Sequence, residues 1–223
     1  MAQYKLHGFC QSGNSYKVAL YLQCAGLDWE PVFVDFFNGQ TRDPEWRKTV
    51  NEMGEAPVLE YVPKHALEDS ATKLTQSGAI LSWLADKTGK FRPEGEAQRL
   101  ETLRWTFFDN HKFTSYFATY RFMKAFLKQE PDPAVMAFLK GRFDAALGVV
   151  EKHLGTSKFV VGNTPTIADF SLAGYMFYPP EESGYDWAKA NPNLVAWLER
   201  IRALPGWKGP YELLPGERIR PRR

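Results

Sequence analysis

The chain has 223 residues, enough for one large domain or two smaller ones. Hydrophobic residues make up 44% of it and aromatic residues 15%, so it can bury a substantial core and intrinsic disorder is excluded. The net charge is only +2, with acidic and basic side chains interspersed, which argues against a nucleic-acid-binding surface over the body of the chain. A basic tail, 218–223, is the exception, and we interpret it as a solvated end.

The cysteine content and the apolar runs indicate where the protein is found. Cys10 and Cys24 are the two cysteines, too few for a disulfide framework and compatible with a reducing compartment. The first residues lack the apolar stretch of a signal peptide. No run approaches the ~20 apolar residues that a membrane span needs. We therefore expect a cytoplasmic protein with no membrane partner.

The first third of the chain alternates between strand and helix patterns. Residues 4–9 alternate polar and apolar side chains as a strand does, and residues 15–25 change to helical spacing, with Gly26 as a stop signal. Residues 29–35 are rich in β-formers and predict a second strand, parallel to the first through a right-handed crossover. A short helix is predicted over residues 44–50.

A hairpin and a helix complete this part of the chain. Residues 57–61 and 73–75 predict two antiparallel strands, separated by a polar excursion over 63–71. Residues 78–86 predict a helix. The resulting order (βαβ, an irregular helix, then ββα) is that of a thioredoxin-like domain, which we assign to residues 1–86.

The remainder of the chain predicts an all-helical domain. Residues 87–96 are polar and rich in Gly and Pro, as a linker is, and helical periodicity dominates the assigned domain, 97–223. Thr166 and Asp169 have the spacing of a capping box at a helix start. The helices are predicted over 97–128, 134–154, 166–178 and 193–203.

Three short motifs in the first domain can bind an anionic, peptide-like ligand. Ser12-Gly13-Asn14-Ser15 opens a helix and Thr75-Gln76-Ser77 precedes another, and helix N-termini favour a thiolate or a carboxylate. Ala56-Pro57-Val58 opens a strand, where the proline fixes an extended backbone with which a peptide can pair.

In this order the three motifs resemble the N-terminal domain of the glutathione transferases. Residues 162–170 (GNTPTIADF) are similar to the signature of that family's all-helical C-terminal domain, so the resemblance covers nearly the whole chain. It implies glutathione as co-substrate, a small hydrophobic electrophile as second substrate, and a homodimer. Glu52 departs from the pattern, which has a proline there. No metal is expected, because the four histidines are scattered without carboxylates around them.

The resemblance implies that Ser12 stabilises the glutathione thiolate, as in the serine-type classes such as theta and zeta. The tyrosine of the alpha, mu and pi classes falls on Gly8, which argues against a tyrosine mechanism. Cys10 is the alternative: it resembles in position the nucleophilic cysteine of omega-like members and would form a mixed disulfide with glutathione. Ser12 as a plain helix cap and Cys10 as an inert buried side chain also stay open.

The remaining site residues follow from the same resemblance. Ala56, before a cis Pro57, would pair with the cysteinyl backbone of glutathione, and Glu55 adjoins this dipeptide. Gln76 and Ser77 would bind the γ-glutamyl end. The glycyl carboxylate needs a cation or an amide, for which Gln40, Arg42 and Lys48 are candidates.

An aromatic stretch in the helical domain suits a flat apolar acceptor, although such a stripe also suits a core or a dimer contact. Its members are Phe113, Tyr116, Phe117 and Tyr120. The predicted function is conjugation of glutathione to a small hydrophobic electrophile. Two alternatives are a glutathione-dependent thiol transferase or peroxidase using Cys10, and a non-enzymatic protein that uses this fold for binding.

Overall fold

The computed structural model describes residues 2–63 and 71–222. It divides into two compact units. One comprises Met1–Lys90 with Pro205–Arg218, and the other comprises Phe91–Leu204 with Ile219–Arg223. The division falls inside the stretch proposed as a linker. Residues 205–218, which the sequence assigned to the helical domain, group instead with the first unit, where α11 (Pro210–Leu213) packs against α1 (Gly13–Cys24).

The first unit is built on a four-stranded sheet with the order β2-β1-β3-β4. Its strands are β1 (Tyr4–Gly8), β2 (Trp29–Phe33), β3 (Val58–Tyr61) and β4 (Thr72–Thr75). The first pair is parallel, as the predicted crossover requires, and the other two pairs are antiparallel. The polar excursion predicted over 63–71 lies almost wholly outside the described residues.

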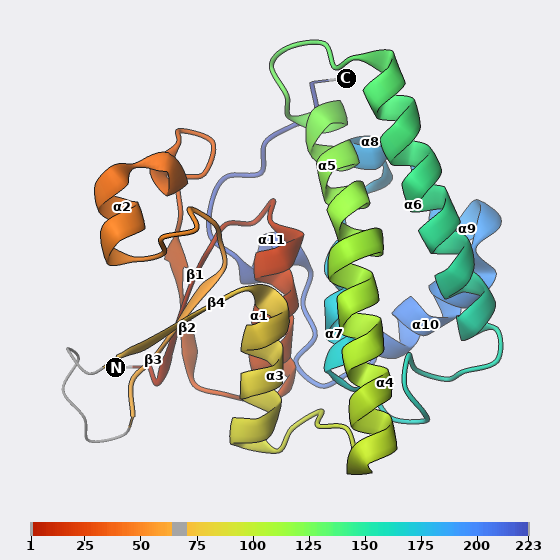
Figure 1. Cartoon of the computed structure of the whole chain (residues 1–223), viewed down its shortest axis with the longest axis horizontal. Coiled ribbons are helices and arrows are strands. Elements are labelled where there is room, and N and C mark those ends of the chain that lie inside the picture. Colours follow the sequence, from red (N-terminus) through yellow and green to blue (C-terminus); the bar gives the residue numbers. More distant parts are fainter. Residues whose placement is uncertain (1, 64–70, 223) are drawn as a thin grey trace. The chain divides into compact units, whose positions relative to one another are not determined.

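Helices cover both faces of this sheet. Figure 1 shows α1 and α3 (Ser77–Thr88) on one face and α2 (Pro44–Thr49) on the other. Apolar side chains of α1 and α3, such as Val18 and Ile80, are fully buried, as is Leu6 of the sheet. On the opposite face Trp46 of α2 packs with Phe9 and Val58. The helical segments are α1 (Gly13–Cys24), η1 (Gln40–Arg42), α2 (Pro44–Thr49), α3 (Ser77–Thr88) and α11 (Pro210–Leu213). These observations confirm the thioredoxin-like fold.

The second unit is helical, as predicted, but its first predicted helix is interrupted, the predicted helix over 166–178 ends at Ala173, and two short helices lie between 180 and 190. The pattern over 97–128 predicts a single helix, whereas a π-helical segment, η3 (Asp109–Phe113), separates α4 (Gly95–Phe108) from α5 (Thr114–Ala125). Asp109 is fully buried there and accepts hydrogen bonds from Thr114 Oγ1 at 2.6 Å and Ser171 Oγ at 2.5 Å. The π-helical segment therefore begins at a buried side chain whose two oxygens both accept hydrogen bonds.

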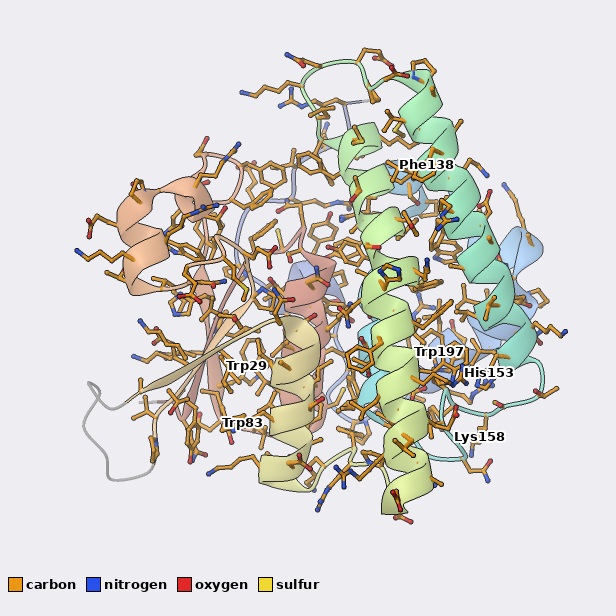
Figure 2. The ribbon with its side chains drawn as sticks, viewed as in Figure 1. Trp29, Trp83, Phe138, His153, Lys158 and Trp197 are labelled. Carbon is orange, nitrogen blue, oxygen red and sulfur yellow. The ribbon has the colours of Figure 1, made fainter. Side chains whose placement is uncertain are left out.

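The other helices of this unit surround a second buried carboxylate. They are α6 (Pro133–Leu154), α7 (Ile167–Ala173), α8 (Pro180–Ser183), α9 (Trp187–Ala190) and α10 (Pro192–Arg202). Asp169 accepts from the Thr166 and Val160 N–H groups and from Trp197 Nε1, each at 2.8 Å (Figure 2 labels Trp197). This carboxylate therefore joins α7, the loop before it and α10, which is a folding role.

No helix within residues 2–63 and 71–222 combines the length and the apolar character that crossing a bilayer requires.

Candidate functional site

Four loops that carry the predicted binding residues meet at one edge of the sheet. Strand pairing joins His7 to Val58 and Val58 to Thr75, while Gly8 at the end of β1 pairs with Phe33 at the end of β2. The segments that follow β1, β2 and β4, and the segment that precedes β3, are therefore neighbours. The Ser12, Ala56-Pro57 and Gln76-Ser77 motifs thus gather at the same edge, although 65 positions of sequence separate the first from the last.

Ser12 is the N-cap of α1, and its hydroxyl oxygen accepts two hydrogen bonds from Ser15. Its Oγ accepts hydrogen bonds from the Ser15 N–H at 3.1 Å and from Ser15 Oγ at 3.0 Å. Among the described residues, no acceptor takes the proton of the Ser12 hydroxyl. This hydroxyl, 5% exposed, therefore combines a free donor with the positive end of a 12-residue helix.

Gly8 leaves the room that Ser15 needs beside Ser12. A Cβ atom added at Gly8 would lie 2.7 Å from Ser15 Cβ and 2.8 Å from Ser15 Oγ. Such distances force a shift of neighbouring atoms. A tyrosine at this position is therefore incompatible with the observed Ser12–Ser15 pair.

Cys10 lies on the same loop but is covered by the end of the chain. Its side chain is 1% exposed, and its Sγ donates toward the Gly216 carbonyl oxygen at 3.4 Å. The next residue, Gln11, donates from Nε2 to the Glu217 carbonyl oxygen at 2.7 Å. Sequence reasoning missed Gln11, because its partner lies 206 residues away and no local pattern signals the contact.

The segment before β3 presents a peptide group for pairing. The Ala56–Pro57 bond is cis, as the resemblance implied. Neither the amide nor the carbonyl of Ala56 has a hydrogen-bond partner among the described residues. Nearby in the fold, Gln40 uses its side-chain oxygen to accept from the Asp35 N–H at 2.6 Å, which leaves its NH₂ group as a donor. Arg42 and Lys48 are exposed.

The segment after β4 combines a strained residue with a helix N-terminus. Gln76 has φ 66° and ψ 109°, a backbone conformation that residues other than glycine rarely adopt. Its Nε2 donates to Glu55 Oε2 at 2.7 Å, which joins two of the predicted glutathione-binding residues. Ser77 begins α3, and its side chain is buried with no hydrogen-bond partner among the described residues. The first N–H groups of α3 and the Ser77 hydroxyl can therefore bind a carboxylate.

The four aromatic residues predicted for the acceptor occupy different environments in the helical unit. Phe113 and Phe117 are 0% and 1% exposed and pack on Phe143, so they belong to the core of this unit. Tyr116 is half-buried and its hydroxyl accepts from Arg142 at 3.3 Å. A role for these residues in acceptor binding stays a prediction.

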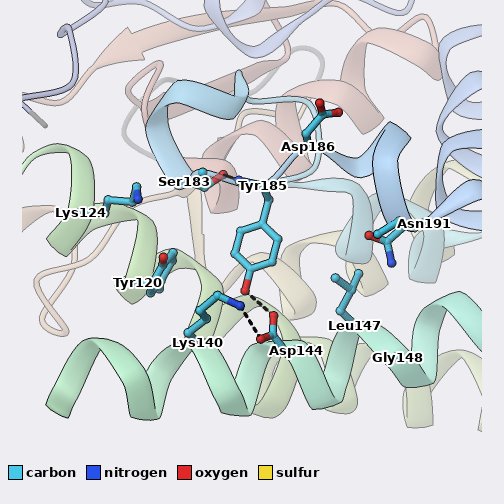
Figure 3. Close-up of a pocket in the computed structure, with 12 residues that line it drawn as sticks. Tyr120, Lys124, Lys140, Asp144, Leu147, Gly148, Ser183, Tyr185, Asp186 and Asn191 are labelled. Carbon is cyan, nitrogen blue, oxygen red and sulfur yellow. Dashed lines mark hydrogen bonds and ion pairs between the residues drawn. The ribbon is translucent and has the colours of Figure 1, made fainter. Parts of the chain in front are cut away.

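Tyr120, the fourth, lines a cavity of about 510 Å³ within the helical unit (Figure 3). Asp144 lies in the same cavity, where one carboxylate oxygen accepts from the Tyr185 hydroxyl and the other pairs with Lys140 Nζ at 2.6 Å. Burial raises the pKa of Tyr185, and the hydrogen bond to Asp144 raises it further. Tyr185 therefore stays a neutral hydrogen-bond donor, and its bond to Asp144 fixes the side of the cavity that it lines.

The parts of the chain that the structure describes contain no cluster of three or more His, Cys, Asp or Glu side chains able to hold a metal ion.

Comparisons with known proteins agree with this architecture. The model of the glutathione S-transferase N-terminal domain matches residues 2–86, and that of the C-terminal domain matches residues 133–200. The disulfide-bond oxidoreductase YfcG of Escherichia coli is 32% identical over 88% of this chain and 89% of its own length.

Two solved structures are similar over nearly the whole chain. A glutathione S-transferase from Pseudomonas fluorescens is 32% identical with a TM-score of 0.81, covering 94% of this chain and 99% of the other. A glutathione transferase homologue from Lodderomyces elongisporus, solved with two GSH per subunit, is 25% identical with a TM-score of 0.84, covering 96% of this chain and all of the other. From the matched domain models, the shared sequence and the fold, the chain belongs to the glutathione S-transferase family.

Proposed function

We propose that the protein is a glutathione transferase that conjugates glutathione to a small hydrophobic electrophile. The observation that carries the proposal is the hydroxyl of Ser12, which accepts two hydrogen bonds from Ser15 and keeps its own proton free at the N-terminus of α1. A free thiol has a pKa near ~8.5, and a helix N-terminus with one donor lowers the pKa by about one unit or more. The thiolate is then present at neutral pH.

The tripeptide would bind along the sheet edge. Its γ-glutamyl carboxylate would accept from Ser77 and the first N–H groups of α3, with Gln76 at the α-amine. Its cysteinyl backbone would pair with Ala56, and its glycyl carboxylate would accept from the Gln40 amide. The free donors and acceptors at these four positions support this mode of binding.

The chemical step then needs little from the protein beyond orientation. The thiol proton leaves to solvent, and the thiolate sulfur forms a bond to the electrophilic carbon. In a substitution the leaving group departs with the electron pair of the bond that breaks; in an addition the adjacent atom takes up a proton from water. Ser12 donates to the sulfur throughout, and Tyr116 and Tyr120 are the candidates for contact with the acceptor.

Similarity to a disulfide-bond oxidoreductase favours thiol–disulfide exchange as the second candidate function. The thiolate of glutathione would attack one sulfur of a disulfide, forming a mixed disulfide and releasing the other sulfur as a thiolate. In this structure Cys10 is a poor nucleophile for such a reaction, because it is 1% exposed and covered by backbone carbonyl groups. Ser12 would then stabilise the glutathione thiolate in thiol–disulfide exchange, as it would in conjugation.

A homodimer in the cytoplasm is part of the proposal. Leu100, Leu103 and Phe107 lie on one side of α4 and are 60%, 40% and 68% exposed, which is unusual for an apolar stripe on a monomer. Neither Cys10 nor Cys24 forms a disulfide bond in the described residues, which suits a reducing compartment.

Steady-state kinetics on paired substrates tests the proposal. Conjugation to an aryl halide and reduction of a small disulfide should both be measured for the wild type, Ser12→Ala and Cys10→Ser. We expect Ser12→Ala to lower kcat for conjugation at pH 7 by about 10–100-fold, the value of one hydrogen bond to a charged sulfur. Cys10→Ser should retain it. Loss of activity in Cys10→Ser with retention in Ser12→Ala would contradict the proposal and support a cysteine mechanism.

A further inference from the structure

The loop that carries Ser12 is held from outside by the end of the chain. This loop, 9–12, connects β1 to α1 and has one internal backbone hydrogen bond, from the Ser12 N–H to the Phe9 carbonyl at 3.0 Å. Residues 215–217, which we call the C-terminal strap, supply the acceptors around it. The Cys10 N–H donates to the Pro215 carbonyl at 2.9 Å, and Gln11 Nε2 donates to the Glu217 carbonyl at 2.7 Å.

The strap is itself fixed within the first unit. The hydroxyl of Tyr16, on α1, donates to the Lys208 carbonyl at 2.8 Å, and Leu213 and Leu214 are buried just before the strap. Gly216 has φ 110°, and a Cβ added there would lie 2.9 Å from the ring of Phe33 and 3.5 Å from Cys10 Sγ. A side chain at position 216 would therefore strain the backbone and press on the Phe33 ring, whereas its distance to Cys10 Sγ is that of an ordinary contact.

Gln11 is the side chain that joins the two segments. It is 5% exposed, so its amide is desolvated and its hydrogen bond to the Glu217 carbonyl is protected from water. Gln11 precedes Ser12 directly, so a shift of this residue changes where the Ser12 hydroxyl points. A displacement of ~1 Å is enough to weaken a catalytic contact.

We propose that Gln11 and the C-terminal strap position Ser12 for the glutathione thiolate, with Gln11 as a positioning residue that does not touch the substrate. This inference rests on the proposed role of Ser12. It predicts that release of the strap uncovers the Cys10 thiol and weakens thiolate stabilisation together, because the Glu217 carbonyl lies against both Cys10 Sγ and Gln11 Nε2.

Cys10 provides a readout that needs neither glutathione nor catalysis. Its rate of reaction with an aromatic disulfide reagent measures how often the strap opens, since the thiol is buried while the strap is closed. A Cys24→Ser background makes Cys10 the sole reactive thiol.

The experiment compares Gln11→Ala with Glu217→Ala in this background. Glu217→Ala is the matched control, because it removes an exposed side chain and leaves the carbonyl that Gln11 binds. A chain ending at Leu214 removes the strap altogether. For each protein we would measure Cys10 labelling, kcat, KM for glutathione, and the pH at which bound glutathione ionises. Thermal unfolding followed by circular dichroism would verify that each variant is folded.

We expect Gln11→Ala to raise the labelling rate by about tenfold, as expected for one buried hydrogen bond, and to lower kcat by a similar factor. The pKa of the bound thiol should rise, KM should change by less than about threefold, and Glu217→Ala should resemble the wild type. The truncated chain should exceed Gln11→Ala in both effects; if it does not fold, Gln11→Ala alone carries the test.

Two results would overturn the inference. One is an unchanged labelling rate in Gln11→Ala, which would mean that the amide does not hold the strap. The other is faster labelling with unaltered kcat and thiol ionisation, which would mean that the strap covers Cys10 without positioning Ser12. Wild-type activity in Ser12→Ala would refute the proposed function instead, and the labelling rates would still report whether Gln11 holds the strap.

Discussion

Replacement of Gln76 by glycine separates backbone strain from ligand binding at the candidate site. With φ 66° and ψ 109°, a non-glycine residue at this position costs about 1–3 kcal/mol relative to a relaxed backbone. Its side chain contributes little to stability, because the hydrogen bond to Glu55 is exposed to solvent. Gln76→Ala keeps the strain and loses this contact, whereas Gln76→Gly loses the contact and relieves the strain.

Relief of this strain stabilises the Gln76→Gly protein, but the greater freedom of glycine in the unfolded chain costs about 1 kcal/mol. The Gln76→Gly protein should therefore be more stable than the Gln76→Ala protein by about 1 kcal/mol. For a chain of this length the difference corresponds to about 2–4 °C in Tm. Both variants should bind glutathione several-fold more weakly, because both lose the side-chain amide.

Glu94 supplies the matched control for this comparison. It is also an N-cap without a side-chain capping bond, but its φ of −93° is ordinary. The Glu94→Gly and Glu94→Ala pair therefore measures the capping preference for glycine alone. Differential scanning calorimetry and isothermal titration with glutathione would follow all four variants. If the glycine and alanine variants differ equally in Tm at positions 76 and 94, the backbone at Gln76 is not strained. If the Gln76 variants bind glutathione as tightly as the wild type, Gln76 is not part of the site.

Three further predictions concern the core, the surface and the thiols. Asp169→Ala should lower the free energy of unfolding by at least about 3 kcal/mol in urea titrations, because three buried N–H donors lose their acceptor; a loss below about 1 kcal/mol would contradict the folding role of this carboxylate. Phe107→Glu should shift the protein from dimer to monomer in size-exclusion chromatography with light scattering, and a wild-type protein that is already monomeric would exclude the proposed dimer. Burial raises the pKa of the Cys24 thiol to about 12. In a Cys10→Ser background, the rate at which iodoacetamide alkylates Cys24 should therefore rise about tenfold per pH unit up to pH 10. A plateau of this rate near pH 9 would mean that the thiol is solvated.

Local patterns in the sequence predicted most of the fold because most elements carry their own signals. Alternation over residues 4–9 and helical spacing after Ser15 fix the opening unit, and Gly26, with φ 67°, ends the helix as expected. Parallel pairing of β1 and β2 follows from the intervening helix. The sequence also predicts the capping box of Thr166 and Asp169, because both partners lie within one helical turn.

Two features could not be predicted because the contacts that accompany them join residues distant in sequence. The π-helical segment forms where buried Asp109 meets Ser171, a contact between residues 62 positions apart. The C-terminal segment leaves the helical unit and returns to β1 and α1, and nothing in residues 205–218 indicates that destination.

The sequence indicates where the segments of the candidate site lie, and the roles of their residues stay predictions. Ser12, Ala56 and Ser77 stand at element boundaries, and strand register brings their segments to one edge. The orientation of Ser12 depends on Ser15, and the space for Ser15 depends on Gly8, so the free proton could be recognised only in three dimensions. Burial of Phe113 and Phe117 is likewise a packing outcome, since an aromatic stripe has the same spacing whether it faces a core or a ligand.

Direct titration of the sulfur in the binary complex is the measurement on which the account depends. Ultraviolet difference spectra across a pH series report thiolate formation in glutathione bound to the wild type and to Ser12→Ala. We expect half-ionisation in the wild type about one to two pH units below that of free glutathione, and a return most of the way toward the free value in Ser12→Ala. Identical titration curves for the two proteins, or a wild-type curve that coincides with free glutathione, would contradict thiolate stabilisation by Ser12.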